Sequence, residues 1–210
     1  MRSLFIIPFA IIVLYSCRKD KITTENKVYN IVEIAIDSNK IINSIDSFIP
    51  HGSGCGYVQY PTDSSDVDSL DLDMDGFIDS YLYAKSWYNF VSASYPCVNY
   101  CHSIGLSSVD TFTQFTKELP YNQAALFDES TIIDTNCSWD YSVMLALSVP
   151  LAPFSCSYTG LHYIGYRRKT NLGYNYGWLK VESYDYGVRI LEAAINKTYD
   201  MGIPAGKKVN

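Results

Sequence analysis

The stretch Tyr176-Gly-Trp-Leu-Lys-Val181 decides the fold class, because its side chains alternate with the period of a β-strand. Trp178 and Lys180 share one face of this strand, and Leu179 and Val181 share the other. Trp178 suits either a core anchor or an exposed platform for sugars, and we favour the core. Gly177 permits a close approach by a neighbouring strand.

Other short segments of the chain have the same β-rich character, and clusters of Gly, Pro, Asn or Asp separate most of them. They are Ile31–Ile36, Tyr81–Tyr88, Tyr141–Val149, Leu161–Arg167, Trp178–Ser183 and Val188–Ile195. Helical periodicity is scarce, and only residues 111–119 and 122–127 are expected to form short helical turns. The pattern predicts an all-β fold: a single antiparallel β-sandwich, jelly-roll-like, with few short helical turns.

Composition agrees with this prediction and limits the function. The 210 residues include 19 Tyr, 9 Phe and 3 Trp, residue types that favour strands. With 48% hydrophobic residues the chain can bury a full-sized core, which excludes a disordered protein. The net charge of −6 argues against nucleic acid as a partner.

The strongest chemical signal is the segment Asp71-Leu-Asp-Met-Asp-Gly-Phe-Ile-Asp79, here called the aspartate loop. Its carboxylates stand at the first, third, fifth and ninth positions, and Gly76 at the sixth permits a sharp bend. The carbonyl of Phe77, at the seventh position, is expected to point inward. Oxygen ligands in this spacing predict a structural Ca2+ site made by Asp71, Asp73, Asp75, Phe77 and Asp79. A solvated acidic turn is the alternative.

The aspartate loop is not an EF-hand. Leu82 stands at the twelfth position, where an EF-hand has a bidentate Glu, and the segment that follows is rich in Tyr and Trp. The loop is therefore expected to lead into a strand. Asp66 and Asp68 lie just upstream and are candidates for an additional ligand.

The N-terminus has the pattern of an export signal. Arg2 precedes an uncharged run from Leu4 to Tyr15, which is too short to span a bilayer. Leu14-Tyr-Ser-Cys17 resembles the lipobox of bacterial lipoproteins, which implies acylation of Cys17. We therefore expect residues 1–16 to be a lipoprotein signal peptide, 17–29 a lipidated tether and 30–210 the β-sandwich domain. An ordinary signal peptide is the alternative.

Five cysteines remain beyond Cys17, namely Cys55, Cys97, Cys101, Cys137 and Cys156. An exported protein meets oxidising conditions in which disulfides can form, and the odd number leaves at least one thiol free or paired between chains. The Cys97-x-x-x-Cys101-His102 segment lacks a second pair at zinc-finger spacing, so a structural thiol or disulfide is favoured over zinc.

An ordered set of C-terminal motifs carries a resemblance to a family. The set comprises His162-Tyr-Ile-Gly-Tyr-Arg167, Tyr176-Gly-Trp-Leu-Lys-Val181, Gly187–Ala194 and Ile203-Pro-Ala-Gly206. Together with the aspartate loop it resembles uncharacterised exported bacterial β-sandwich proteins, which include Bacteroidota lipoproteins and PEP-CTERM-type proteins. The sequence departs from the pattern at Leu191-Glu-Ala, where the family tends to have an aromatic residue. The resemblance implies the fold and export but no catalytic residue.

These features predict a lipid-anchored protein of the cell envelope, with the outer membrane as the expected site. Nucleophile-elbow, Walker A and zincin motifs are absent from the sequence, which favours a binding or structural role over catalysis. The expected partners are the membrane, through the anchor, and a glycan or an envelope protein. The alternative is a glycan hydrolase that uses a carboxylate pair, and an assembly subunit with an open edge strand is a third hypothesis. Arg167-Arg-Lys169, the one basic cluster, is expected to be a solvated hairpin end.

Overall fold

The computed structural model describes residues 28–43, 64–90, 98–120, 122–148, 156–157, 159–184 and 187–208. This part of the chain is all-β and contains no helix. Consequently no helix in it could cross a membrane. The longer strands are β3 (Ser64–Leu70), β4 (Ser80–Phe90), β5 (Val98–Ser108), β6 (Thr113–Glu118), β11 (Ser142–Ser148), β13 (Gly160–Thr170), β14 (Gly173–Ser183) and β15 (Gly187–Asn196). The shorter ones are β1 (Ile31–Ile34), β2 (Ile42–Asn43), β7 (Gln123–Ala124), β8 (Leu126–Phe127), β9 (Ile132–Ile133), β10 (Trp139–Asp140), β12 (Cys156–Ser157) and β16 (Ile203–Pro204).

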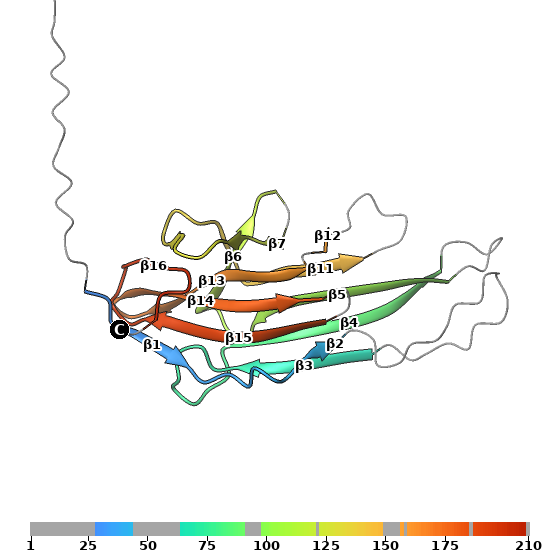
Figure 1. Cartoon of the computed structure of the whole chain (residues 1–210), viewed down its shortest axis with the longest axis horizontal. Coiled ribbons are helices and arrows are strands. Elements are labelled where there is room, and N and C mark those ends of the chain that lie inside the picture. The colour runs from blue at the N-terminus through green and yellow to red at the C-terminus, as the bar shows by residue number, and fades with distance from the viewer. Residues whose placement is uncertain are drawn as a thin grey trace, which may run out of the picture.

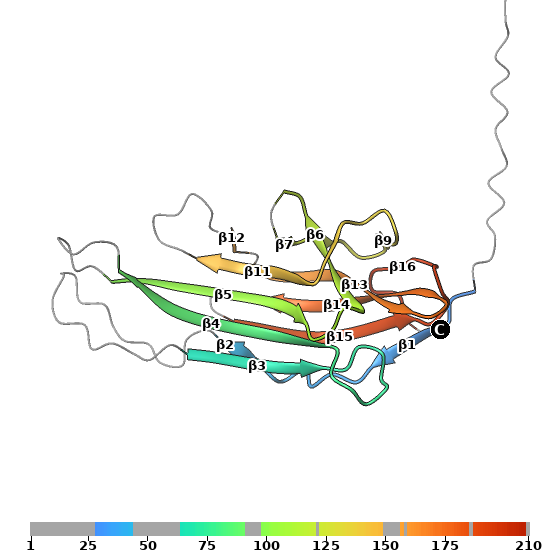
Figure 2. The same ribbon diagram turned by 180° about the vertical axis from the view of Figure 1, so that it is seen from behind.

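The strands form one large curled sheet in the order β1-β15-β14-β13-β6-β7-β11-β5-β4-β3, and β9 and β16 form a separate pair. Two antiparallel meanders make up its halves, β3-β4-β5 and β13-β14-β15, and the short strands β6 and β7 join them through β11 (Figures 1 and 2). Because the sheet curls, the two meanders share one core and the fold is sandwich-like. The predicted all-β sandwich-like class is confirmed.

The main core lies between the two meanders. Leu179 and Val181 of β14 belong to the same buried cluster as Leu82 of β4 and Ile104 of β5. A second cluster covers the other face of β14, where the side chain of Trp178 is fully buried beside Ile203 of β16. The strand alternation predicted for residues 176–181 is therefore correct, and Trp178 is a core anchor.

The helical turns predicted for residues 111–119 and 122–127 are wrong. Residues 113–118 form β6, which pairs with β13 and with β7, while the later segment forms β7 and β8. Phe115 is fully buried against the main core. Pairing with strands distant in sequence therefore overrides the weak local helical preference.

Several predictions concern residues outside the described part. The signal peptide, Cys17, most of the tether, Cys55 and Cys97 lie there. For Cys101 and Cys156 the structure describes only the strand positions, in β5 and β12. The thiol of Cys137 is described and is free.

Candidate metal centre

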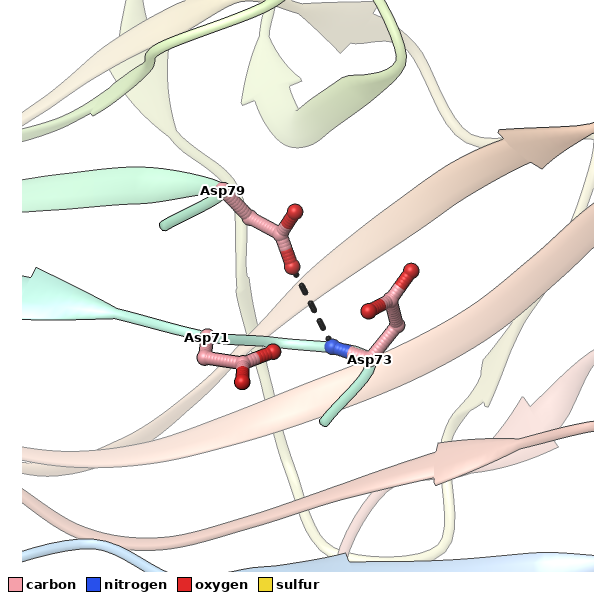
Figure 3. Close-up of side chains that lie close together, drawn as sticks. All are labelled: Asp71, Asp73 and Asp79. Carbon is pink, nitrogen blue, oxygen red and sulfur yellow. Dashed lines mark hydrogen bonds between the residues drawn. The ribbon is translucent and has the colours of Figure 1, made fainter. Parts of the chain in front are cut away.

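The aspartate loop connects β3 to β4 and brings three of its carboxylates together. Asp79 closes the hairpin by donating its backbone N–H to the carbonyl of Leu70, at 2.8 Å. Asp71, Asp73 and Asp79 each offer an oxygen, and these oxygens lie within 4.8 Å of one another (Figure 3). Among the described residues this is the one group of His, Cys, Asp and Glu side chains with such a geometry. The cluster could hold a metal ion.

Backbone N–H groups orient these carboxylates before any ion arrives. Asp71 accepts hydrogen bonds from the N–H groups of Met74 at 2.7 Å and Gly76 at 2.8 Å. Oδ2 of Asp79 accepts from Leu72 at 2.7 Å and from Asp73 at 3.2 Å, the latter drawn in Figure 3. A carboxylate oxygen has two lone pairs, so an oxygen that accepts one N–H can also ligate a cation. The loop is therefore preorganised for oxygen ligation.

The bend of the loop depends on two residues with positive φ. Gly76 has φ +90°, and a Cβ built there meets no atom within 4 Å. Glycine is therefore favoured at this position by its backbone conformation and not by a lack of space for a side chain. Met74 has φ 62°, which costs a non-glycine residue about 1–2 kcal/mol. The predicted role of Gly76 in the sharp turn is confirmed.

Asp75 and Phe77 do not join the close group. Oδ1 of Asp75 accepts the N–H of Phe77 at 2.9 Å, and its Oδ2 lies 3.8 Å from Nη2 of Arg168. The side chain of Phe77 is 74% exposed. Ligation by Asp75 and by the Phe77 carbonyl remains a prediction.

Arg168 is the functional residue that the sequence analysis missed. Its guanidinium, only 12% exposed at the side chain, forms ion pairs with Asp73 and Asp79. It also lies 3.2 Å from Oδ2 of Asp110 and donates to the hydroxyl of Thr113 at 3.0 Å. The predicted solvated hairpin end at residues 167–169 is therefore wrong for this residue.

The alternation of side chains along β13 would have predicted that Arg168 lies on the face that points to the core. Ile164 and Tyr166 of β13 point into the main core, and Arg168 is the next residue on that face. Its neighbour Arg167 points to the other side, where its guanidinium stacks on Trp139 and Tyr174 and donates to Gln114. Neither arginine is a free surface cation.

Burial dominates the electrostatics of Asp79. Its side chain is 1% exposed, and desolvation raises the pKa to about 6, although Arg168 and the N–H of Leu72 act in the opposite direction. Oδ1 makes no hydrogen bond, and its contact with Arg168 is an ion pair without hydrogen-bond alignment. Asp79 thus presents a buried oxygen with remaining capacity for a cation.

The local charge favours a further cation. Arg168 lies within ion-pair distance of Asp110 and of three of the four loop carboxylates, and the ammonium of Lys197 donates to the backbone carbonyl of Asp73 at 2.7 Å. Burial disfavours ionisation of Asp110, but the N–H groups of Phe112 and Thr113 and the charge of Arg168 bring its pKa below the usual value. With all carboxylates ionised, five negative charges face two positive ones, and a divalent ion would remove most of the excess.

The other candidate ligands lie elsewhere. Asp66 and Asp68 are on β3, where Asp68 pairs with Lys40 at 2.6 Å and Asp66 accepts the N–H of Asn43. Leu82 is buried in the main core, as expected for a residue that does not ligate. His162 faces the carbonyl of Thr159 at 3.1 Å, and the described Cys137 is not part of a metal-binding group.

Comparisons with known proteins identify no relative: no family model, no curated protein and no solved structure matches the chain.

Proposed function

We propose that this protein is a lipid-anchored β-sandwich protein of the cell envelope, stabilised by Ca2+ in the aspartate loop, with a binding or structural role. The observation that supports the ion is the convergence of Asp71, Asp73 and Asp79 on a loop that joins two strands of the sheet. The anchor rests on the lipobox-like segment that ends at Cys17. Carboxylate oxygens that converge on one loop suit Ca2+, which accepts six to eight oxygen ligands in irregular geometry. Mg2+ is the weaker candidate, because it demands a small octahedral shell.

The proposed ion would stabilise the fold rather than react. Asp79 is buried and tied to both sheet halves, since its carbonyl accepts the N–H of Val109 and its carboxylate pairs with Arg168 of β13. Close by, the hydroxyl of Tyr166 donates to the carbonyl of Leu72 at 3.1 Å. A cation that fixes the loop would therefore also fix β3 and β4 against β13.

Thermal melts in EDTA, Mg2+ and Ca2+ test the proposed ion. An ion that binds only the folded state stabilises it by RT ln(1 + [L]/Kd). For an assumed Kd of ~0.1 mM, typical of weak extracellular sites, a hundredfold excess of Ca2+ gives about 2.7 kcal/mol. We expect the melting temperature to rise by roughly 5–10 °C in Ca2+ and by less in Mg2+.

Asp71→Ala and Asp73→Ala should each remove most of the difference between Ca2+ and EDTA. Asp128→Ala is the matched control, because Asp128 is exposed and lies outside the cluster. The readout is the difference in melting temperature between Ca2+ and EDTA for each variant. The melting temperature in one buffer is not sufficient, because Asp73→Ala also removes an ion pair with Arg168. If the folded wild type had the same melting temperature in all three buffers, the aspartate loop would be a solvated acidic turn and not a cation site.

The anchor half of the proposal is tested separately by metabolic labelling with a fatty-acid analogue. Cys17 is the residue that the lipobox-like segment positions for acylation. Cys17→Ser should abolish the label and release the protein from membranes, whereas Cys137→Ser should change neither. Undiminished labelling of the Cys17 variant would contradict the anchor.

A further inference from the structure

Exposed apolar side chains gather on the connections around the aspartate loop. Phe77 is 74% exposed and Leu172, in the turn between β13 and β14, is 69% exposed. The remaining members are about half exposed: Met74 and Ile78 of the loop, and Val109 and Phe112 between β5 and β6. We call these six residues the apolar rim. Exposed apolar side chains grouped in this way mark interaction surfaces.

Hydrogen bonds show that the three connections are neighbours. Val109 donates its N–H to the carbonyl of Asp79 at 2.9 Å, which joins the second connection to the loop. Lys169 donates its N–H to the carbonyl of Phe112 at 2.8 Å, which joins the β13–β14 hairpin to the second connection. Arg168 bridges all three through its pairs with Asp73 and Asp110. The rim therefore belongs to one end of the domain.

The chain enters the domain at this same end. Lys197 donates its backbone N–H to the carbonyl of Asn30 and its ammonium to the carbonyl of Asp73, each at 2.7 Å. One residue thus links the first described segment to the aspartate loop, and Figure 1 shows β1 beginning at the end where this loop lies. Cys17 precedes Asn30 by thirteen residues, which reach at most about 45 Å.

We propose that the apolar rim docks onto the surface of a lipid bilayer. The inference rests on the proposed acylation of Cys17, because the anchor is what would hold this end of the domain near the membrane. Partly exposed Phe, Leu, Ile and Met side chains enter the boundary between headgroups and acyl chains, and each gains free energy from the apolar area it buries. The short chain to the anchor raises the effective concentration of the rim at the bilayer.

The test measures partition onto vesicles of phosphatidylcholine and phosphatidylethanolamine, in Ca2+, with the full chain carrying Cys17→Ser. The apolar run Leu4–Tyr15 is common to all variants and none carries an acyl chain, so differences in binding between variants report the domain surface. Phe77→Ser or Leu172→Ser should each lower the partition coefficient about tenfold, the factor that corresponds to about 1.4 kcal/mol and to the transfer of one large apolar side chain. Leu161→Ser is the matched control, since Leu161 is 53% exposed at the opposite end of β13.

The parent protein in this test is the Cys17→Ser chain. The docking surface is supported if the two rim variants lose vesicle binding while Leu161→Ser binds as the parent does. The melting temperatures of all variants should stay near that of the parent. No vesicle binding by the parent, or equal loss in Leu161→Ser, overturns it. A dimer in sedimentation that dissociates in Phe77→Ser also overturns it, in favour of a second copy as the occupant. Acylation of the wild type is measured separately, so failure of the docking surface and failure of the anchor are distinguishable.

Discussion

Arg168→Met should destabilise the protein in EDTA by about 3 kcal/mol and should tighten Ca2+ binding at least tenfold. The substitution leaves the buried carboxylate of Asp79 without its cation, and removing one partner of a buried ion pair costs about 3–5 kcal/mol. The same loss removes a positive charge that competes with the ion for Asp73 and Asp79. The melting temperature in EDTA should fall by roughly 6–12 °C. Saturating Ca2+ should recover most of that fall.

Lys169→Met is the matched control for this variant. Lys169 is the next residue of β13, its side chain is exposed, and its described contact is the backbone hydrogen bond to Phe112. The substitution Lys169→Met removes the same formal charge from the same strand, so we expect the free energy of unfolding to change by no more than about 0.5 kcal/mol. If both variants showed the same melting temperatures and the same Ca2+ affinity, Arg168 would have no specific role at the loop.

Gly177→Ala should cost about 3 kcal/mol although it adds a single methyl group. Gly177 pairs with Tyr166 across β13 and β14, and a Cβ on it would lie 2.2 Å from Cζ of the Tyr166 ring. The ring cannot easily move, because its hydroxyl donates to the carbonyl of Leu72 at 3.1 Å and lies 3.3 Å from the carbonyl of Ala194. Overpacking of this kind costs about 1–3 kcal/mol, and here it also disturbs the residue next to the aspartate loop.

Urea denaturation at neutral pH measures this cost. Gly76→Ala is the comparison, because a Cβ there meets no atom within 4 Å and the cost is limited to about 1 kcal/mol for its positive φ. A Gly177→Ala midpoint equal to that of the wild type would show that Tyr166 does not pack on this glycine.

Local alternation predicted much of the fold. Because side chains alternate along a strand, Trp178 was predicted on one face of β14 and Leu179 and Val181 on the other. Both faces are buried, one in each of the two core clusters. The sequence did not reveal that β6 joins the two halves of the sheet, because its partners in β13 are about fifty residues away. Short segments such as residues 113–118 take their structure from such partners rather than from local propensity.

The candidate site was predictable where its candidate ligands are close in sequence. Asp71, Asp73 and Asp79 lie on one loop, and their spacing with Gly76 predicted their convergence. Arg168 and Lys197 come from distant strand ends, so spacing could not place them. Asp110 lies outside the loop in sequence, yet it pairs with Arg168. The pairing of strands that are distant in sequence brings these charges together.

Equilibrium dialysis against Ca2+ tests the central claim most directly, because it counts bound ions without relying on stability. The account predicts one Ca2+ per chain at saturation, weakened by Asp71→Ala and by Asp73→Ala and tightened by Arg168→Met. Asp128→Ala should bind as the wild type does. Weak extracellular sites have Kd values up to about 1 mM. If the folded wild type bound no Ca2+ at concentrations up to about 10 mM, ten times that value, the aspartate loop would not be a calcium site.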